Sequence, residues 1–355
     1  MKVTVLRPRE LKETELHTWR CFQRENPSLQ NPFLSPEFTL AVGRVHDRAR
    51  VAVIEDGAGT VAFFPYERGP FGIAKAIGAG INDCQGLIHA PRFDCDPQAL
   101  LAACDLSVWE FDHLLSDQLP FQPYHVVCEQ SPVMDLSDGY GMYINGHAGF
   151  HRQVRQAMRR LEREVGPLTF EFDVPDQEAL QTLILWKSAQ YRRTGRFDRF
   201  ARQWIAAIVR DLLKTRSDEC TGTLSMLYAS GKPIAAHFGP RSQSVLCSWF
   251  PAYDLTFARY KPGLLLFDRM AEAAAAQGIR YLDLGKGQED YKQMLRSEDI
   301  ALAEGWVERP SSATLFRRVQ RAPRRHVQNF VLSRPALRLA ARRALEGFGR
   351  VRSLR

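Results

Sequence analysis

The chain has 355 residues, of which 45% are hydrophobic and 25% are charged, and its formal net charge is +8. This length is sufficient for two domains of ordinary size, and the composition is typical of a soluble globular protein. The first residues contain no apolar segment of signal-peptide length, and no window approaches a membrane span. The sequence therefore predicts a cytoplasmic protein rather than a secreted or membrane-spanning one.

The basic residues are concentrated near the C-terminal end. Residues 317–355 contain twelve arginines and one acid, a net charge of +11, whereas residues 1–316 sum to −3. Arginine and apolar residues interleave there, as in Ala336–Leu345, which predicts an amphipathic helix. Such a helix suits peripheral contact with the inner face of an anionic membrane, or with an acidic acyl carrier protein. Nucleic acid ranks lower because no nucleic-acid motif accompanies the tail, and a disordered solubilising tail is the open alternative.

The motifs of several large enzyme classes are missing. The seven cysteines are odd in number and have no Cys-x-x-Cys spacing, which argues against a disulfide framework and against a zinc site. We interpret them as small hydrophobic residues of the core, and we predict no metal. No nucleophile elbow, zinc-protease helix, Walker loop or Rossmann fingerprint is present, so hydrolase, zinc-protease, ATPase and dehydrogenase activities are not indicated.

The first part of the chain predicts strands and helices in mixed order. The predicted elements are a strand at Lys2–Leu6, a helix at about Glu10–Glu25, a loop with a short helix at Asn31–Val45, strands at Arg50–Glu55 and Thr60–Tyr66, a helix near Pro97–Ser116 and a strand at Tyr124–Glu129. Between them, Asn82 and Asp83 follow a glycine-rich stretch. They are candidates to line an acceptor cleft, with an ordinary turn as the alternative.

A strongly basic helix, His151–Glu164, comes next and places Arg152, Arg155 and Arg159 near one face. It is either a solvated linker or a clamp for a phosphate-bearing donor or acceptor, and Arg152 is our candidate for acceptor contact. The elements predicted after it are a strand at Leu168–Phe172, helices at Gln177–Arg193 and Phe200–Lys214, a hairpin of Thr223–Tyr228 with Ile234–Phe238, a strand at Ser244–Phe250, a helix at Leu264–Gln277 and a strand at Ile279–Leu284.

The two hairpins resemble each other. Val53-Ile-Glu-Asp-Gly is followed by Val-Ala-Phe-Phe, much as Leu227-Tyr-Ala-Ser-Gly is followed by Ile-Ala-Ala-His-Phe. This similarity suggests that the chain contains two diverged copies of one domain. The first copy has no clear counterpart of the loop described next, so we expect it to pack on the second copy and to help shape the acceptor cleft.

The loop before the helix at Leu264–Gln277 has the composition of an anion site. It ends in Tyr260-Lys-Pro-Gly263 and opens a helix, where unpaired main-chain N–H groups and the positive end of the dipole meet. Arg259 and Lys261 add formal charge. The alternative is an ordinary turn between a loop and a helix.

Several blocks resemble the CelD-like branch of the GNAT acyltransferases, itself similar to the Fem-type aminoacyltransferases. The blocks are Asn31–Phe38, His151–Arg163, Tyr253-Asp254, Arg259-Tyr260, Pro262-Gly263, Tyr281–Gly287 and Tyr291-Lys292. Lys261 departs from the family, which usually carries a small hydroxyl residue there. The resemblance implies a tandem fold that binds the pantetheine of a CoA donor along the strand Ser244–Phe250, and the pyrophosphate on the loop Arg259–Gly263. The donor-binding residues it suggests are Trp249, Phe250, Arg259, Tyr260, Lys261 and Gly263.

Acyl transfer to an amine needs a base and a proton donor for the leaving thiolate. His237, in a strand, titrates near neutrality, and Asp283 ends a buried strand; a core histidine and a turn aspartate are the alternatives. The resemblance adds Tyr291, as proton donor to the thiolate, and Lys292, as a contact to phosphate or carbonyl. Tyr253 is included among the acceptor-binding candidates.

The sequence thus predicts an α/β (α+β) protein of tandem GNAT-like domains, each with a mixed, largely antiparallel sheet flanked by helices. The expected parts are an N-terminal domain at 1–148, a linker helix at 149–166, a donor-binding domain at 167–316 and an Arg-rich tail at 317–355. The predicted activity is transfer of an acyl group from acyl-CoA, or an acyl carrier protein, to an amine of a cell-envelope or exopolysaccharide precursor. The alternatives are a lipid or sphingoid amine acceptor, an aminoacyl-tRNA donor, and a non-catalytic accessory role in polysaccharide synthesis.

Overall fold

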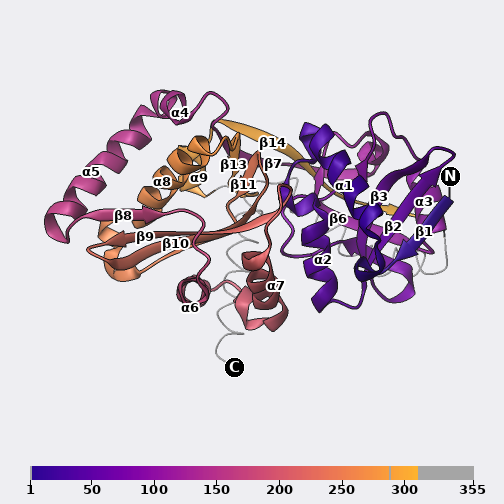
Figure 1. Ribbon diagram of the computed structural model, residues 1–355, viewed down its shortest axis with the longest axis horizontal. Helices are drawn as coiled ribbons and strands as arrows, with labels where there is room; N and C mark the ends of the chain where they lie inside the picture. Colours follow the sequence, from indigo (N-terminus) through magenta and orange to yellow (C-terminus); the bar gives the residue numbers. More distant parts are fainter. Residues whose placement is uncertain (1, 288, 311–355) are drawn as a thin grey trace, which may run out of the picture.

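The computed structural model describes residues 2–287 and 289–310 (Figure 1), so the predicted Arg-rich tail lies outside the described residues. Within this part, fourteen strands form one mixed sheet. Its main path runs β1-β2-β3-β4-β6-β14-β7-β13-β11-β10-β9-β8. The fold is a long mixed sheet flanked by helices, as predicted.

The first half of the chain supplies one end of this sheet. Its elements are β1 (Lys2–Leu6), α1 (Glu13–Glu25), α2 (Pro36–Val45), β2 (Ala49–Asp56), β3 (Gly59–Arg68), β4 (Ile73–Ala76), β5 (Ile88–His89), α3 (Pro97–Ala103), β6 (Val108–Leu115) and β7 (His125–Asp135). The α1 and α2 helices lie together over the sheet at the right of Figure 1.

The second half supplies the other end. Its elements are α4 (Tyr140–Gly146), α5 (Ala148–Glu164), β8 (Leu168–Glu171), α6 (Gln177–Arg193), α7 (Gln203–Lys214), β9 (Thr221–Ala229), β10 (Lys232–Arg241), β11 (Val245–Cys247), β12 (Phe250–Tyr253), α8 (Pro262–Ala276), β13 (Tyr281–Asp283), α9 (Asp290–Leu295) and β14 (Glu298–Glu308). The turn of the β9–β10 hairpin uses Ser230 and Gly231 at φ of 47° and 74°, the backbone that two-residue hairpins favour.

The two halves repeat one order of elements. In each, a strand (β1 or β8) is followed by two helices and a hairpin (β2–β3 or β9–β10). A strand antiparallel to the hairpin then leads through a crossing helix, α3 or α8, to a parallel strand: β4 pairs with β6 and β11 pairs with β13. When each strand on the main path of the sheet is replaced by its counterpart in the other half, the same order results, read from the opposite end.

The last strand of each half pairs with the opposite half. The β7 strand reaches β13 of the second half, and β14 returns to lie between β6 and β7, with Glu308 opposite Val108 and Glu298 opposite Val133. The sheet therefore runs without a break across the predicted boundary between residues 148 and 167. Because this strand exchange crosses the boundary, the relative placement of the halves is set by main-chain hydrogen bonds as well as by side-chain packing.

One apolar layer also joins the halves. Buried side chains of α1, α2, α6 and α7 form a single cluster on one face of the sheet, with Trp19 and Phe250 fully buried in it. On the other face, α3 covers the first half and α4, α5 and α8 cover the second. Among the described residues, no helix is both long and apolar enough to cross a membrane.

Three sequence predictions are corrected by the structure. The helix predicted near Pro97–Ser116 ends at Ala103, because Asp105 adopts a left-handed turn and Val108–Leu115 forms β6. The strand predicted at Ser244–Phe250 is interrupted at Ser248 and Trp249, which separates β11 from β12. Not all cysteines are in the core either, since Cys128 is exposed on β7.

Candidate functional site

The predicted anion loop is formed by the start of α8. A 3-10 helix, Leu255–Tyr260, leads to Lys261 in the left-handed conformation (φ 53°, ψ 50°), and α8 begins at Pro262. Proline lacks an N–H, and its fixed φ suits the first helical position. Lys261 offers no side-chain cap to the helix. The Leu264 N–H donates to Lys261 O at 3.0 Å, so the Gly263 N–H is the group of the first turn that is left for an external acceptor.

Space for such an acceptor exists at Gly263. A Cβ placed there would find its nearest neighbour 3.9 Å away, at the ring of Tyr253. The main chain of the first helical turn is thus uncovered on this side, as an approaching phosphate requires. This contact places Tyr253 beside the predicted donor loop, and its contact with the acceptor stays a prediction.

The other side chains of the loop bind it to α5. Tyr260 is 2% exposed, and its hydroxyl donates to Glu164 Oε2 at 3.0 Å, while the Arg259 guanidinium contacts both groups. The Lys261 ammonium donates to Gln153 Oε1 at 2.9 Å. The Tyr260 side chain therefore anchors the loop from inside and is not available to a donor. The charged groups of Arg259 and Lys261 belong to the loop that leads into α8.

The strands beside the loop separate at the predicted donor strand. The parallel β11 and β13 stay paired through Cys247 and Asp283, and the Ser248 N–H still donates to Asp283 O at 2.7 Å. Beyond that point β12 pairs, among the strands that the structure describes, only with β10, whereas the Leu284 N–H donates to Pro132 O on β7 at 2.9 Å. A wedge-shaped opening in the hydrogen-bonded ladder therefore lies between β12 and the end of β13.

The main chain of β12 presents a defined set of groups to this opening. The Asp254 N–H donates to Ile234 O at 3.0 Å, towards β10. Because strand groups alternate in direction, Phe250 and Ala252 also face β10, whereas Pro251 and Tyr253 face away from it. The Pro251 carbonyl and the Tyr253 N–H and carbonyl thus line the open edge, and an extended ligand that contains amides can pair with them.

The side chains predicted to bind the donor along this strand have another role. Phe250 is fully buried against Phe200, and Trp249 donates its indole N–H to Ile81 O of the first half at 2.8 Å. Both rings belong to the aromatic cluster that joins the halves. The two side chains therefore cannot contact a donor, and only main-chain groups of this segment can.

A cluster of charged groups lies where the halves meet, near the end of β13. The Lys292 ammonium is buried and donates to the carbonyls of Gly285 and Lys286 at 2.9 and 3.0 Å, with Glu289 at 3.4 Å. Asp83 of the first half reaches the same place: a Cβ on Gly285 would meet its Oδ2 at 3.7 Å and the Lys292 ammonium at 3.9 Å. The structure thus brings together Asp83 and Lys292 from opposite halves.

Asp283 faces a cavity between the halves. Its carboxylate accepts from Ser131 Oγ at 2.5 Å and from the Gly285 N–H at 2.9 Å, and burial raises its pKa. The cavity has a volume of about 240 Å³. Its lining comes from both halves and includes Ser28, Asn31, Cys84, Asp117, Tyr281 and Asp283.

Three other candidates are placed less favourably. His237 is fully buried, neither ring nitrogen has a hydrogen-bond partner among the described residues, and burial lowers its pKa to about 3. With no route to a substrate, it is a core histidine. Asn82 is also buried, and its side chain bonds Ile77 O and the Cys84 N–H, so it shapes the turn that carries Asp83. Tyr291 stacks on Phe267 of α8, and burial raises the pKa of its hydroxyl.

Arg152 does not share a site with Asp83. It is exposed on α5, which packs against α8 and against the 3-10 helix before it. In Figure 1, α5 lies at the outer edge of the second half, far from the helices of the first half. Arg152 and Asp83 therefore do not line one acceptor site, and the acceptor contact of Arg152 stays a prediction.

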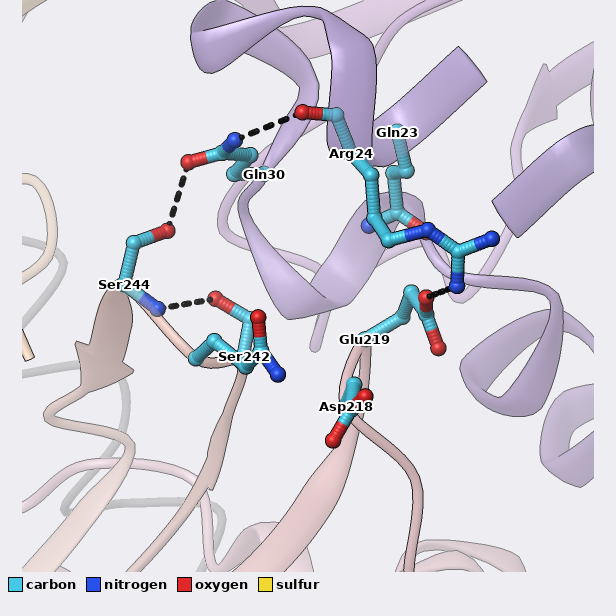
Figure 2. A pocket seen from close by; sticks show the side chains of 8 residues that line it. Gln23, Arg24, Gln30, Asp218, Glu219, Ser242 and Ser244 are labelled. Carbon is cyan, nitrogen blue, oxygen red and sulfur yellow. Dashed lines mark hydrogen bonds and ion pairs between the residues drawn. The ribbon is translucent and has the colours of Figure 1, made fainter. Parts of the chain in front are cut away.

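A second cavity, of about 180 Å³, lies at the opposite end of β10 and β11 and is shown in Figure 2. Two pairs of its polar side chains are bonded: Ser244 Oγ donates to Gln30 Oε1 at 2.7 Å, and Arg24 donates to Glu219 at 2.6 Å. These bonds join the end of α1 to loops of the second half. We interpret this cavity as part of the contact between the halves.

Sequence reasoning missed Lys187. The buried residues of α6 recur at helical spacing: Leu180, Leu183, Ile184, Lys187, Ser188 and Tyr191. Lys187 thus occupies a place in the apolar stripe of an amphipathic helix, where a charged residue is unusual. That mismatch was visible in the sequence. What the sequence could not show is that the side chain ends at the open edge of β12.

Comparisons with known proteins agree with this geometry. Residues 148–293 match the family described as the acetyltransferase (GNAT) domain. No match was found among curated proteins. Among solved structures, FemX is 10% identical with a TM-score of 0.62, and the alignment covers 89% of this chain and 99% of FemX. A conserved protein of unknown function from Bacteroides thetaiotaomicron is 13% identical with a TM-score of 0.55, covering 84% of this chain and 97% of that one. The C-terminal domain of a protein assigned as a lysylphosphatidylglycerol synthetase, from Agrobacterium fabrum, is 15% identical with a TM-score of 0.51, covering 78% and 89%.

The strand opening beside an uncapped helix defines the second half as a GNAT-type fold, and the structural neighbours extend the likeness of fold to most of the chain. Residues 148–293 contain a GNAT acetyltransferase domain, and this domain indicates GNAT-type acyltransferase activity in general.

Proposed function

We propose that the protein is an N-acyltransferase that uses an acyl-CoA donor and transfers the acyl group to an amine of a cell-envelope or exopolysaccharide precursor in the cytoplasm. The observation that carries the donor assignment is the uncapped start of α8 next to the open edge of β12. The acceptor class comes from the CelD-like resemblance of the sequence. The amine enters from the junction of the halves, where Asp83 and Lys292 lie.

The described residues fit a CoA donor. CoA carries phosphates at one end and an arm with two amides that ends in the thioester. The start of α8, with Gly263 uncovered and Lys261 beside it, suits the phosphates. The Pro251 carbonyl and the Tyr253 N–H offer one acceptor and one donor to the amides. An acyl carrier protein would present the same arm and one phosphate, without the nucleotide, so its donor would leave part of the loop unused.

The chemistry requires few groups. The amine nitrogen forms a bond to the thioester carbonyl carbon, the C–S bond breaks, and the thiolate leaves and takes a proton. Main-chain N–H groups at the opening can stabilise the negative charge that develops on the carbonyl oxygen. Burial raises the pKa of the Tyr291 hydroxyl, which makes it a weaker acid than an ordinary tyrosine, so the thiolate takes its proton more readily from the group that deprotonated the amine or from solvent. We assign Lys292 to holding the loop Gly285–Gly287 at this point.

The first test is thermal melting with acetyl-CoA, longer acyl-CoAs and free CoA. A ligand at a hundredfold excess over its dissociation constant stabilises the native state by about 2.7 kcal/mol. Gly263→Trp should remove this shift without lowering the melting temperature of the free protein, because the position is open. Gly57→Trp is the matched control, since nothing lies within 4 Å of a Cβ in that turn of the first half. An unchanged ligand shift in Gly263→Trp would overturn the donor assignment.

The acceptor is tested separately, by release of free CoA thiol in the presence of glucosamine, of sphingosine and of other primary amines. Turnover with an amino sugar supports the proposed acceptor class, and turnover only with the lipid amine replaces it. Binding of aminoacyl-tRNA without any CoA-induced shift would favour the Fem-type alternative. A protein that binds neither donor would be a non-catalytic accessory protein.

A further inference from the structure

Lys187 is the one charged residue in the apolar stripe of α6 that crosses β12. Its side chain is 9% exposed, and its ammonium donates to Pro251 O at 2.8 Å. The ring of Tyr191, one turn further along α6, lies 5.3 Å from the same nitrogen. Within the described part of the chain, Pro251 is the only hydrogen-bond acceptor of this ammonium.

The bond from Lys187 to Pro251 is informative because Pro251 lies on the open edge of β12. Proline has no N–H to donate, and residue 251 faces away from β10, so its carbonyl belongs to the open edge of β12. The Lys187 nitrogen therefore lies at the opening in the sheet where β12 and β13 have separated. This is the place where the proposed function puts the donor arm and its thioester.

The charges around Lys187 come from three further segments. Arg196 and Arg199 follow α6, Lys292 and Glu289 come from the start of α9 and the residue before it, and His237 faces it from β10. Burial is the largest influence and the positive neighbours add to it, with Glu289 in opposition; together they lower the pKa of Lys187 to about 7. The side chain therefore exchanges its proton in the neutral range, where lysine normally stays charged.

We propose that Lys187 is the general base of the acyl transfer and accepts the proton from the attacking amine. The proposal rests on the proposed function. The neutral Lys187 nitrogen takes a proton from the acceptor nitrogen as that nitrogen bonds to the carbonyl carbon. The C–S bond then breaks, the thiolate leaves, and Lys187 returns its proton to the thiolate or to solvent.

The other candidate bases fit this role less well. The Asp283 carboxylate already accepts from Ser131 Oγ and from the Gly285 N–H, so the oxygen that would take the proton is occupied. His237 is fully buried, and burial lowers its pKa to about 3, so it is a weak base. Lys187 combines one hydrogen bond, a position at the edge of β12 and neighbours that favour its neutral form, as buried catalytic lysines do.

The test compares Lys187→Met, Lys187→Arg and Lys214→Met. Methionine preserves the length and loses the base, arginine keeps a charge that does not titrate, and Lys214 is an exposed lysine at the end of α7. With acetyl-CoA and an amine that the wild type turns over, both Lys187 variants should lose two to four orders of magnitude in kcat. Lys214→Met should keep wild-type activity. The wild-type rate should rise with pH through about 7, and this limb should vanish in the residual activity of Lys187→Met.

The outcomes separate this proposal from the proposed function. Lys187→Met should still show the melting shift with free CoA, so a lost activity with retained CoA binding supports the base. A Lys187→Met enzyme within threefold of the wild type overturns the base and leaves the acyltransferase assignment standing. If the wild type shows no shift with any acyl-CoA and releases no thiol with any amine, the donor assignment fails first and the proposal is overturned with it.

Discussion

The crossing helices of the two halves begin in opposite ways. In the first half, α3 is capped by Asp96, whose carboxylate accepts from the N–H groups of Gln98 and Ala99. In the second, α8 follows Lys261, which offers no cap. The first helix therefore satisfies two of its N-terminal N–H groups with a negative side chain, whereas the second has no side-chain cap and leaves the Gly263 N–H to an external anion.

The strand openings differ in the same sense. In the first half, Gln85 inserts beside β6: its N–H donates to His113 O at 2.8 Å, and its carbonyl accepts from the Leu115 N–H at 3.0 Å. The chain thus fills the gap that follows the β4–β6 pair. In the second half no described segment pairs with the outer edge of β12 in this way, and Lys187 alone bonds there. Two copies of one topology can therefore carry one donor site, because the other copy closes its own opening.

Removal of the charge on Lys187 should produce the largest change in stability. Lys187 lies seven residues after Leu180, the first buried leucine of α6. The residue in the same place on α1 is Gln23, which is uncharged and donates to Asn31 O. Lys187→Met should raise the free energy of unfolding at neutral pH by on the order of 2–4 kcal/mol, because a buried cation is lost and each unit of pKa is worth about 1.4 kcal/mol.

The stability gained in Lys187→Met should depend on pH. The folded-state pKa of Lys187 is lowered to about 7 from 10.5, so the penalty is full below pH 7 and disappears as pH rises towards 10.5. The difference between wild type and Lys187→Met, measured by urea unfolding, should therefore shrink between pH 7 and 10. A difference that stays constant over this range would show that Lys187 has an ordinary pKa, and Lys214→Met should show no such trend.

Donor affinity should respond next, to a negative charge at the start of α8. Lys261→Asp makes the second half resemble the first by placing a carboxylate beside the first turn, and aspartate tolerates the left-handed backbone of this position. We expect CoA to bind about a hundredfold more weakly, about 2.7 kcal/mol, in calorimetric titration. Lys261→Asn is the control because it fits the same backbone without charge, and an equal loss in both variants would contradict the electrostatic explanation.

The sequence was informative where the physics is local. The Tyr260-Lys-Pro-Gly263 loop was predictable because proline and glycine at a helix start act through their own backbone. The helices and hairpins of the second half were predictable for the same reason. The swap of β7 and β14 was not, because it depends on pairing between strands distant in sequence.

The roles of side chains were harder to predict than the elements. Trp249, Phe250 and Tyr260 lie on the predicted donor segments, but their rings pack inward, and burial is a tertiary property. His237 was a reasonable candidate base because histidine titrates near neutrality, but the structure places it in the core. Lys187 could have been noticed as a charge in an apolar stripe. Its contact with Pro251 required the α6 helix to be docked on β12.

The smallest predicted effect concerns the cap of the first half. Asp96→Ala removes the carboxylate that holds the start of α3, and substitutions of this kind cost about 0.5–2 kcal/mol of stability. Urea unfolding should detect this loss. CoA binding should be unchanged, because Gln85 still closes the opening between β4 and β6, so an uncapped helix alone does not make a donor site. A new CoA site in the first half of this variant would show that the cap, and not the closed strand edge, is what distinguishes the two copies.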